Sequence, residues 1–456
     1  MKKYYRLLVL LISVTAILFS SCSAFAQTPE SNHSIEEVSQ NSLTTYYAYQ
    51  GMGSNANNTG YYSTRDQHTA DFTPYDSLIF TDFATLTQRV LCNIPDCSHT
   101  TKDCMGYRKR LGNLYSPMVI NDHVYYFYNE GLAQTEDDYE DALAHIEVTD
   151  LDGSNARVLY TWNAFEKLDD TFVYDERTNL LYGLITHHNG DVNAITNTHS
   201  LFSLNLETGE MIVEKEFTEF AESDICLWGC ADNRFFIGVM SPIGEIMNGN
   251  RTDITRNYYL YSLEDDTYSS FFSFSKDTAV NNNMPAFTGT FANECFYLLD
   301  FDNITLSAIE MATGEKTILL DASDFQKSFG EDYISPFSLY GVTVKPLGNN
   351  HLLITNPIAP NEPALYLLYD LSTNTILDAS HLSDTLPLTI VAETDTHYLI
   401  ATKMTSTLTT NPNPAIWGDT FSCTSSYALI SKDDYWAGNA NLTEIETLPY
   451  PAQMLR

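Results

Sequence analysis

A recurring unit runs along most of this chain, and it constrains the fold more than any other feature. Its first part is a short strand pattern rich in aromatic and aliphatic residues. The pattern appears as HVYYFY from His123, NLLYGLIT from Asn179, NRFFIGVM from Asn233, ECFYLLDF from Glu294, HLLITN from His351 and HYLIATK from His397. The spacing of the copies, about 46 to 61 residues, lies in or just above the range of β-propeller blades.

The second part of the unit is a strand that enters a polar hairpin and leaves it again, and we count seven of these. They lie at Asp82, Asp150, Leu206, Glu264, Glu310, Leu371 and Ser431. The flanking residues alternate with period two, and turns such as DGSN, ETGE and STNT tolerate hairpin backbone angles. We therefore predict an all-β fold, a seven-bladed β-propeller with four-stranded antiparallel blades. Two stacked β-sandwiches would also show strands and turns, but they do not require one unit to recur in the same internal order.

The N-terminus has the pattern of an export signal. Lys2, Lys3 and Arg6 precede an apolar run, Leu7 to Phe19, that is too short to span a bilayer comfortably. No second long apolar segment follows, so we expect the rest of the chain to lie outside the cytoplasm.

Two alternative cleavage sites can be read at the end of this signal. The sequence FSSC resembles a bacterial lipobox ending in Cys22, the cysteine to be lipidated, although Phe19 stands where leucine is usual. The sequence AFA, ending at Ala26, fits ordinary signal peptidase. We predict a lipoprotein on the outer face of the cytoplasmic membrane, with free secretion after cleavage at Ala26 as the alternative.

A polar stretch separates the signal from the repeats. It is rich in Ser, Asn, Thr, Gln and Gly, which bury too little apolar area to become ordered by themselves. We expect residues 1–22 to be the signal with its lipobox, 23–60 a flexible tether and 61–456 the propeller. Within the tether, Thr44 to Gln50 is apolar enough to add a strand to the fold that follows.

A segment rich in cysteine follows the first hairpin. The sequence LCNIPDCSHTTKDCMGY, Leu91 to Tyr107, resembles the LC-x-x-P-x-C-x-H-x4-C segment of exported β-propeller lipoproteins of gut-dwelling Gram-positive anaerobes. The resemblance extends through the repeats over most of the mature chain. It implies fold and location, and no activity.

Four residues of this segment are candidate metal ligands. Cys92, Cys97, His99 and Cys104 are the ligand set of a structural zinc site, although their spacing matches no standard zinc knuckle. An oxidising exterior favours disulfides instead. If Cys22 is lipidated, seven cysteines remain, and an odd number cannot all pair. They are Cys92, Cys97, Cys104, Cys226, Cys230, Cys295 and Cys423. Structural zinc, one local disulfide and buried unpaired thiols all stay open.

The net charge of the chain and the motifs that its sequence lacks exclude several classes of function. With 59 Asp and Glu against 23 Lys and Arg, the net charge is −36, which excludes a nucleic-acid partner. The motifs G-x-S-x-G, H-E-x-x-H, G-x-x-x-x-G-K-[ST] and G-x-G-x-x-G are absent from the sequence. We interpret His187 and His188 as part of a polar loop, and DLDGSN from Asp150 as a hairpin turn because Thr161 stands where a calcium loop needs Glu.

We therefore expect a monomeric binding or scaffolding module for a protein, peptide or glycan ligand, touching the membrane only through its lipid anchor. The ligand would meet one flat face of the propeller. The expected contact loops are Asn129 to Ala142 and Thr407 to Ser422, which includes Trp417. The alternative is a surface carbohydrate-active enzyme, a glycosidase or lyase, that uses carboxylates in the central funnel. We predict no catalytic residue.

Overall fold

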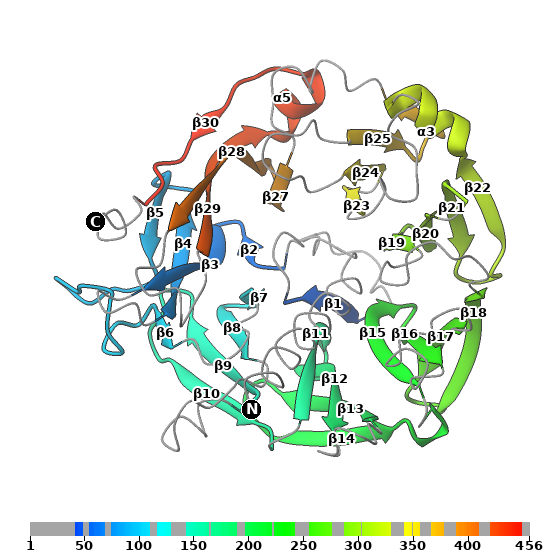
Figure 1. Ribbon diagram of the computed structural model, residues 1–456, viewed down its shortest axis with the longest axis horizontal. Helices are drawn as coiled ribbons and strands as arrows, with labels where there is room; N and C mark the ends of the chain where they lie inside the picture. The colour runs from blue at the N-terminus through cyan, green and yellow to red at the C-terminus, as the bar shows by residue number, and fades with distance from the viewer. Residues whose placement is uncertain are drawn as a thin grey trace, which may run out of the picture.

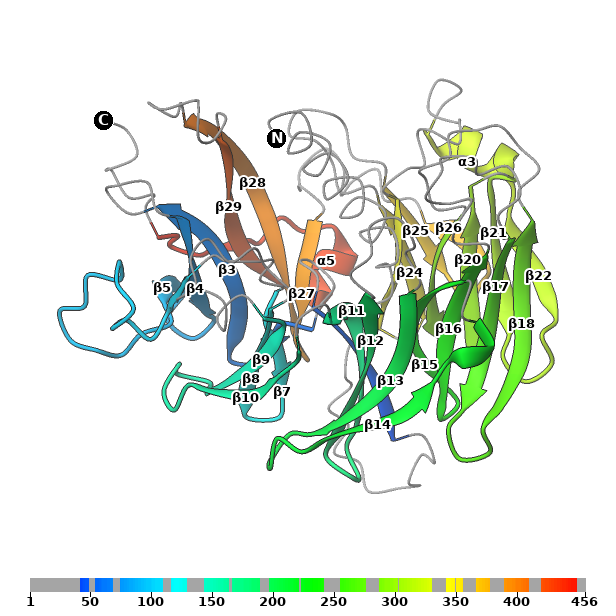
Figure 2. The ribbon, with the colours of Figure 1, turned by 60° about the horizontal axis from the view of Figure 1, so that its bottom comes forward.

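Seven antiparallel sheets follow one another around a ring, as Figure 1 shows face-on and Figure 2 from the side. The structure is a computed structural model that describes residues 42–48, 54–68, 74–109, 116–128, 143–163, 166–188, 197–220, 223–241, 255–275, 287–301, 303–329, 342–348, 350–355, 366–377, 389–409 and 420–448. The predicted seven-bladed β-propeller is confirmed.

The first three blades are built from β1 to β14. Blade 1 contains β2 (Ala56–Asn57), β3 (Gly60–His68), β4 (Pro74–Asp82) and β5 (Thr87–Val90), with β6 (Tyr107–Lys109) also paired to β4. Blade 2 contains β7 (Met118–Ile120), β8 (His123–Tyr128), β9 (His145–Asp150) and β10 (Arg157–Thr161). Blade 3 contains β1 (Leu43–Tyr47), β11 (Glu166–Asp175), β12 (Leu180–His188), β13 (Asn197–Asn205) and β14 (Met211–Glu216).

The other four blades follow in chain order. Blade 4 contains β15 (Asp224–Ala231), β16 (Arg234–Ser241), β17 (Thr255–Ser262) and β18 (Thr267–Ser275). Blade 5 contains β19 (Phe287–Ala292), β20 (Cys295–Asp300), β21 (Thr305–Glu310) and β22 (Lys316–Leu320). Blade 6 contains β23 (Thr343–Leu347), β24 (His351–Thr355), β25 (Tyr366–Asp370) and β26 (Thr375–Leu377). Blade 7 contains β27 (Thr389–Glu393), β28 (His397–Thr409), β29 (Thr420–Ser431) and β30 (Thr443–Glu444). In the part of the chain that the structure describes, three short helices connect strands: η2 (Thr218–Phe220), α3 (Ala322–Phe329) and α5 (Lys432–Ala437).

The recurring aromatic strands are the second strands of blades 2 to 7, and they are apolar because both of their faces are buried. In β8, Tyr125 and Phe127 pack into the cluster shared with blade 3, whereas Val124 and Tyr126 pack into the cluster shared with blade 1. The described residues form seven such clusters, each between neighbouring blades. A strand between two blades thus loses the alternation that marks a half-exposed strand.

Six of the seven predicted hairpins are confirmed. Each has at least one residue with positive φ in its turn. These are Leu86, Gly153 with Asn155, Gly209, Asp266, Gly314 and Asn374. Gly, Asn and Asp adopt this backbone region most easily, which is why those turns were visible in the sequence.

The seventh hairpin, predicted at Ser431, is instead the helix α5 inserted between β29 and β30. The Ser431 side chain accepts a hydrogen bond from the backbone N–H of Asp434, and Gly438 ends the helix with φ 70°. The serine satisfies one of the first free N–H groups of the helix, and its own hydroxyl donates to the Asp434 carboxylate at 2.9 Å, so this segment caps a helix where a turn was expected.

The propeller includes residues that precede the boundary expected at 61. Strand β1 pairs antiparallel with β11 at the inner edge of blade 3 (Figure 1), so the expected strand within the tether exists. Thr45 accepts a hydrogen bond from the N–H of Cys230 in blade 4, at 3.0 Å. An early segment of the chain therefore joins two blades near the middle of the sequence.

The ring closes where the C-terminal segment meets the outer strand of blade 1. Glu446 lies parallel to β5: its carbonyl accepts from Gln88 N–H and its N–H donates to the Leu86 carbonyl, both at 2.8 Å. Arg65 donates to the Leu448 carbonyl at 3.2 Å. Backbone bonds between the two ends of the repeat array thus hold blade 7 against blade 1 (Figure 1).

Candidate metal centre

The cysteine-rich segment is a loop that interrupts the outer strand of blade 1. Strand β5 pairs with the end of β4, and β6 pairs with the beginning of the same strand. The residue between them, Leu78, binds both ends of the loop, since its carbonyl accepts from Leu91 N–H and its N–H donates to the Gly106 carbonyl, each at 2.8 Å. Residues 91–106, the Cys/His loop, thus leave and rejoin one strand edge at a single point.

The Cys/His loop has almost no apolar interior of its own. Leu91 is buried, but Ile94 is exposed. Most of the Asn, Pro, Asp, Ser, Thr and Lys side chains of the loop are exposed as well. Cys104 is buried, and Cys92, Cys97 and His99 are partly buried. The centre of the loop is therefore made of three thiols and an imidazole.

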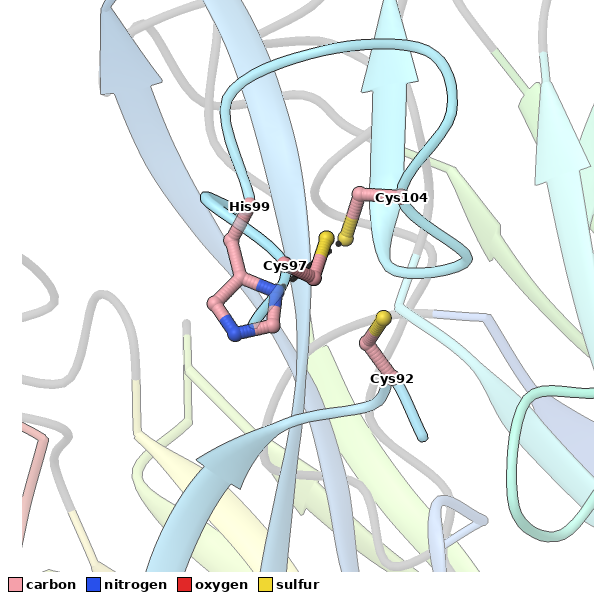
Figure 3. A group of neighbouring side chains, drawn as sticks. All are labelled: Cys92, Cys97, His99 and Cys104. Atoms are coloured by element: carbon pink, nitrogen blue, oxygen red, sulfur yellow. Dashed lines mark hydrogen bonds between the residues drawn. The ribbon is translucent and has the colours of Figure 1, made fainter. Parts of the chain in front are cut away.

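The four predicted ligand residues lie together. Their ligand atoms are all within 4.8 Å of one another, and His99 Nδ1 is 3.3 Å from Cys104 Sγ. Figure 3 shows the side chains turned toward a common point, with Nδ1 of His99 on the side of the sulfurs. His99 has φ 59°, an uncommon value for a residue other than glycine, which indicates that the surrounding loop fixes its position.

The thiols differ in their electrostatics. Burial raises the pKa of Cys92, but hydrogen bonds from the backbone of Ile94 and Met105 and from the Cys104 and Cys97 side chains together lower it below the ordinary value. Burial raises the pKa of Cys104 to about 12, and the neighbouring Cys92 and Cys97 sulfurs add to this effect. The pKa values of these two neighbouring thiols are thus shifted in opposite directions.

The other predicted residues are placed as follows. Cys226, Cys230 and Cys295 lie on the strands of blades 4 and 5. These three cysteines and the three cysteines of the Cys/His loop are all free thiols. Cys22, the whole signal and the expected contact loop Asn129–Ala142 lie outside the described residues, as does most of Thr407–Ser422. Among the residues that the structure describes, no helix is long and apolar enough to cross a membrane.

Two interpretations of polar segments can be compared with the structure. The DLDGSN segment is a hairpin turn, in which the Asp150 carboxylate accepts from Ser154 and Asn155. His187 and His188 end strand β12 and are not part of a loop, because they pair with the beginning of β13. His187 Nδ1 lies 3.0 Å from a carboxylate oxygen of Glu166.

A second polar cluster lies where blades 3 and 4 meet, and it was missed in the sequence. Strand β1 covers β11 only from Thr171 onward, so Asp169 and Asp170 lie at the inner edge of the blade beyond the end of β1. Asp169 Oδ2 accepts from Leu227 N–H of β15 at 3.0 Å. Asp224, which begins β15, has a carboxylate oxygen 3.7 Å from His199 Nε2. We call Asp169, Asp170 and Asp224 the acid cluster.

Burial dominates the electrostatics of the acid cluster. It raises the pKa of Asp224 to about 7, with the charge of Asp169 as the second cause. Burial raises the pKa of Asp170 well above its ordinary value, again followed by Asp169. Lys167 opposes both shifts. The signal that could have revealed the cluster is the acid pair in KLDDTFVY, at the start of an otherwise apolar strand, but nothing local points to Asp224.

No protein-family model matches the sequence, and no curated protein matches it. Several solved structures are similar to it at low sequence identity. The β-propeller domain of the Trilobed protease from Pyrococcus furiosus is 11% identical with a TM-score of 0.44, covering 91% of this chain and 94% of that one. The acylaminoacyl peptidase of Pyrococcus horikoshii is 9% identical with a TM-score of 0.45, covering 88% of this chain and 52% of its own, so this chain spans about half its length. An oligogalacturonate lyase from Vibrio parahaemolyticus is 10% identical with a TM-score of 0.37, covering 74% of this chain and 84% of that one. At these values the likeness carries no information about activity.

Proposed function

We propose that this chain is an exported, lipid-anchored propeller that binds a positively charged segment of a protein, peptide or glycan. The observation that carries the proposal is the position of the two polar clusters. The Cys/His loop lies at the outer edge of blade 1, whereas the acid cluster lies at the inner edge of the ring, where blades 3 and 4 meet. Ligands of propellers reach the ring from its open faces, so the acid cluster is the better placed of the two to meet one.

The charge of the acid cluster indicates the chemistry of the ligand. Burial raises the pKa of all three carboxyl groups, and the charge of Asp169 adds to the shift at Asp170 and at Asp224. A cationic group of the ligand, an ammonium or a guanidinium, would relieve that repulsion and favour the ionised carboxylates. The net charge of −36 would attract the same ligand from a distance.

The test compares two adjacent acid pairs. The exported chain is titrated with a fluorescent oligolysine peptide, and with neutral dextran as a second probe. We expect Asp169→Asn/Asp170→Asn to weaken oligolysine binding at least tenfold. The pair Glu264→Gln/Asp265→Asn removes the same number of carboxyl groups from the exposed hairpin between β17 and β18, and we expect it to bind as the wild type does. Equal weakening by both pairs would show attraction to the overall charge and contradict the proposed site.

An enzyme remains the second candidate, because a raised carboxyl pKa such as that of Asp224 suits a general acid. Glycoside cleavage needs such an acid beside an ionised carboxylate. Incubation with a panel of acidic and neutral polysaccharides would decide between the two functions. New reducing or unsaturated ends that appear with the wild type and not with Asp224→Asn would replace the binding proposal.

The anchor is tested by Cys22→Ser in a Gram-positive host. We expect the wild type to take up labelled fatty acid and to fractionate with membranes, and the variant to lose the label. Cys295→Ser, which alters a thiol of the propeller, is the control. An unlabelled wild type whose mature N-terminus is Gln27 would show secretion after cleavage at Ala26 instead.

A further inference from the structure

We propose that Cys92, Cys97, His99 and Cys104 bind one zinc ion, and that the ion holds the Cys/His loop in the shape that docks blade 1 onto blade 2. The ligands would be three thiolate sulfurs and Nδ1 of His99. This inference does not depend on the proposed binding function, because it concerns another part of the ring.

The donor atoms lie close to the arrangement that tetrahedral zinc requires. Typical zinc–sulfur and zinc–nitrogen bonds place neighbouring ligand atoms about 3.5 to 3.8 Å apart. Here all four ligand atoms lie within 4.8 Å of one another, and the pair His99 Nδ1 and Cys104 Sγ is at 3.3 Å. Small side-chain rotations would complete the tetrahedron. A set of three sulfurs and one nitrogen selects zinc over the hard cations calcium and magnesium, which take oxygen ligands.

A disulfide does not explain this convergence. It needs two sulfurs only, and it gives no reason for a third thiol and an imidazole to turn toward the same point (Figure 3).

The ends of the loop contact the outer hairpin of blade 2. Leu91 packs against Gly153, where a Cβ atom would lie only 2.8 Å from the Leu91 carbonyl oxygen. Asn93 donates to the Asp152 carboxylate at 3.1 Å. The loop must therefore keep its shape to fit between the blades, and its polar composition cannot provide that shape through a hydrophobic core.

Arg108 extends the contact on the other side of the loop. Its guanidinium donates to the Met105 carbonyl at 2.7 Å and pairs with Glu147 of β9, also at 2.7 Å. The metal would thus fix a loop whose two ends each bond to blade 2. Because the four residues supply all four ligands of a tetrahedral ion, no position stays open for substrate, and the role is structural.

The first experiment measures metal and thiols in the exported chain, purified without a polyhistidine tag. We expect one zinc per chain by mass spectrometry of the elements. We also expect three thiols that react with a thiol reagent only after chelation, and intense tetrahedral bands after exchange with cobalt. A metal-free protein with a disulfide between two of the three loop cysteines would overturn the proposal.

A matched pair of variants locates the ion. Cys97→Ser should reduce the zinc content at least fivefold, whereas Cys295→Ser, at a partly buried thiol of blade 5, should leave it unchanged. Unchanged zinc in Cys97→Ser would overturn the assignment. If Cys97→Ser does not fold, the cobalt spectrum of the wild type still reports sulfur and nitrogen ligands.

Hydrogen exchange tests the docking role. Chelation should raise amide exchange at least tenfold in the loop and in the blade 2 hairpin Asp150–Arg157. The hairpin Glu310–Lys316 of blade 5 serves as the internal control and should not change. If chelation raises exchange in the loop alone, the loop binds zinc but the ion does not hold blade 1 against blade 2, and the docking role is contradicted. Oligolysine binding is measured separately, so either proposal can fail without the other.

Discussion

Asp224 shows how one buried carboxyl group can set a pH dependence for the whole fold. Its side chain is 13% exposed and lies 3.7 Å from His199 Nε2, with Asp169 and Lys167 also facing it. Burial raises its pKa to about 7. Near neutral pH the folded protein therefore holds a proton that an unfolded chain would have released.

We expect this proton to make the fold less stable as pH rises from about 4 to 7. An unfolded Asp titrates near pH 3.9, so across that window the folded state binds more protons and the free energy of unfolding falls. Asn cannot ionise, so the free energy of unfolding of Asp224→Asn should fall less between pH 4 and pH 7 than that of the wild type. The two falls should differ by roughly 2 to 4 kcal/mol.

Urea unfolding at several pH values measures this difference. Asp265→Asn, at an exposed hairpin of blade 4, is the control and should follow the wild type. Parallel stability curves for Asp224→Asn and the wild type would show that the carboxyl group is not held protonated by the fold.

Among the elements, α5 shows how a short local pattern can replace a hairpin. The helix places Tyr435 in the cluster between blades 6 and 7, where its ring lies 4.9 Å from that of Tyr398. Ser431 begins the helix, and its hydroxyl oxygen accepts from Asp434 N–H at 3.0 Å. The cap at Ser431 stabilises the first turn of the helix, and burial of Tyr435 holds the same short helix against the blades.

Removal of this cap should destabilise the protein without changing the fold. We expect Ser431→Ala to lower the free energy of unfolding by about 1 kcal/mol. Ser431→Thr keeps a hydroxyl that can accept from Asp434 N–H and donate to the Asp434 carboxylate, and it should retain most of the stability. Thermal or urea unfolding measures both variants, and a full loss in Ser431→Thr would show that the hydroxyl acts in another way.

At the scale of the whole molecule, the ring is held by segments that are distant in sequence. Strand β1 fills the inner edge of blade 3. It buries Tyr46 in the cluster between blades 2 and 3, and Tyr47 in the cluster that joins blades 4 and 5. The C-terminal segment holds blade 7 against β5. Loss of either segment would leave a strand edge and apolar side chains without their partners.

Truncation before β1 should therefore be tolerated, and truncation after it should not. A chain that begins at Ser42 keeps β1 and β2, and we expect it to match a chain that begins at Gln27. A chain that begins at Tyr61 loses the burial of Tyr46 and Tyr47, which costs roughly 3 to 6 kcal/mol for the two side chains. Typical domains are stable by about 5 to 15 kcal/mol, so this chain should unfold at a much lower temperature. Equal unfolding midpoints for all three would contradict the structural role of β1.

The sequence by itself determined the blades, because a blade is built from neighbouring strands. Period-two strands and turn residues such as Asn155, Gly209 and Asn374 depend only on nearby chain. The set of four Cys and His residues could be predicted for the same reason, since one loop contains all of them. The capped helix at Ser431 was missed although its signal is local, because the flanking repeats favoured a hairpin.

The tertiary structure decided which distant segments meet. Asp169 and Asp224 belong to different blades, and Thr45 bonds to Cys230, which lies 185 residues further along the chain. Which edge β1 occupies, and where Glu446 pairs, depends on which strand edges stay unpaired when seven blades close into a ring. Those edges exist only in the assembled ring, so no local pattern of residues can specify the contacts that cover them.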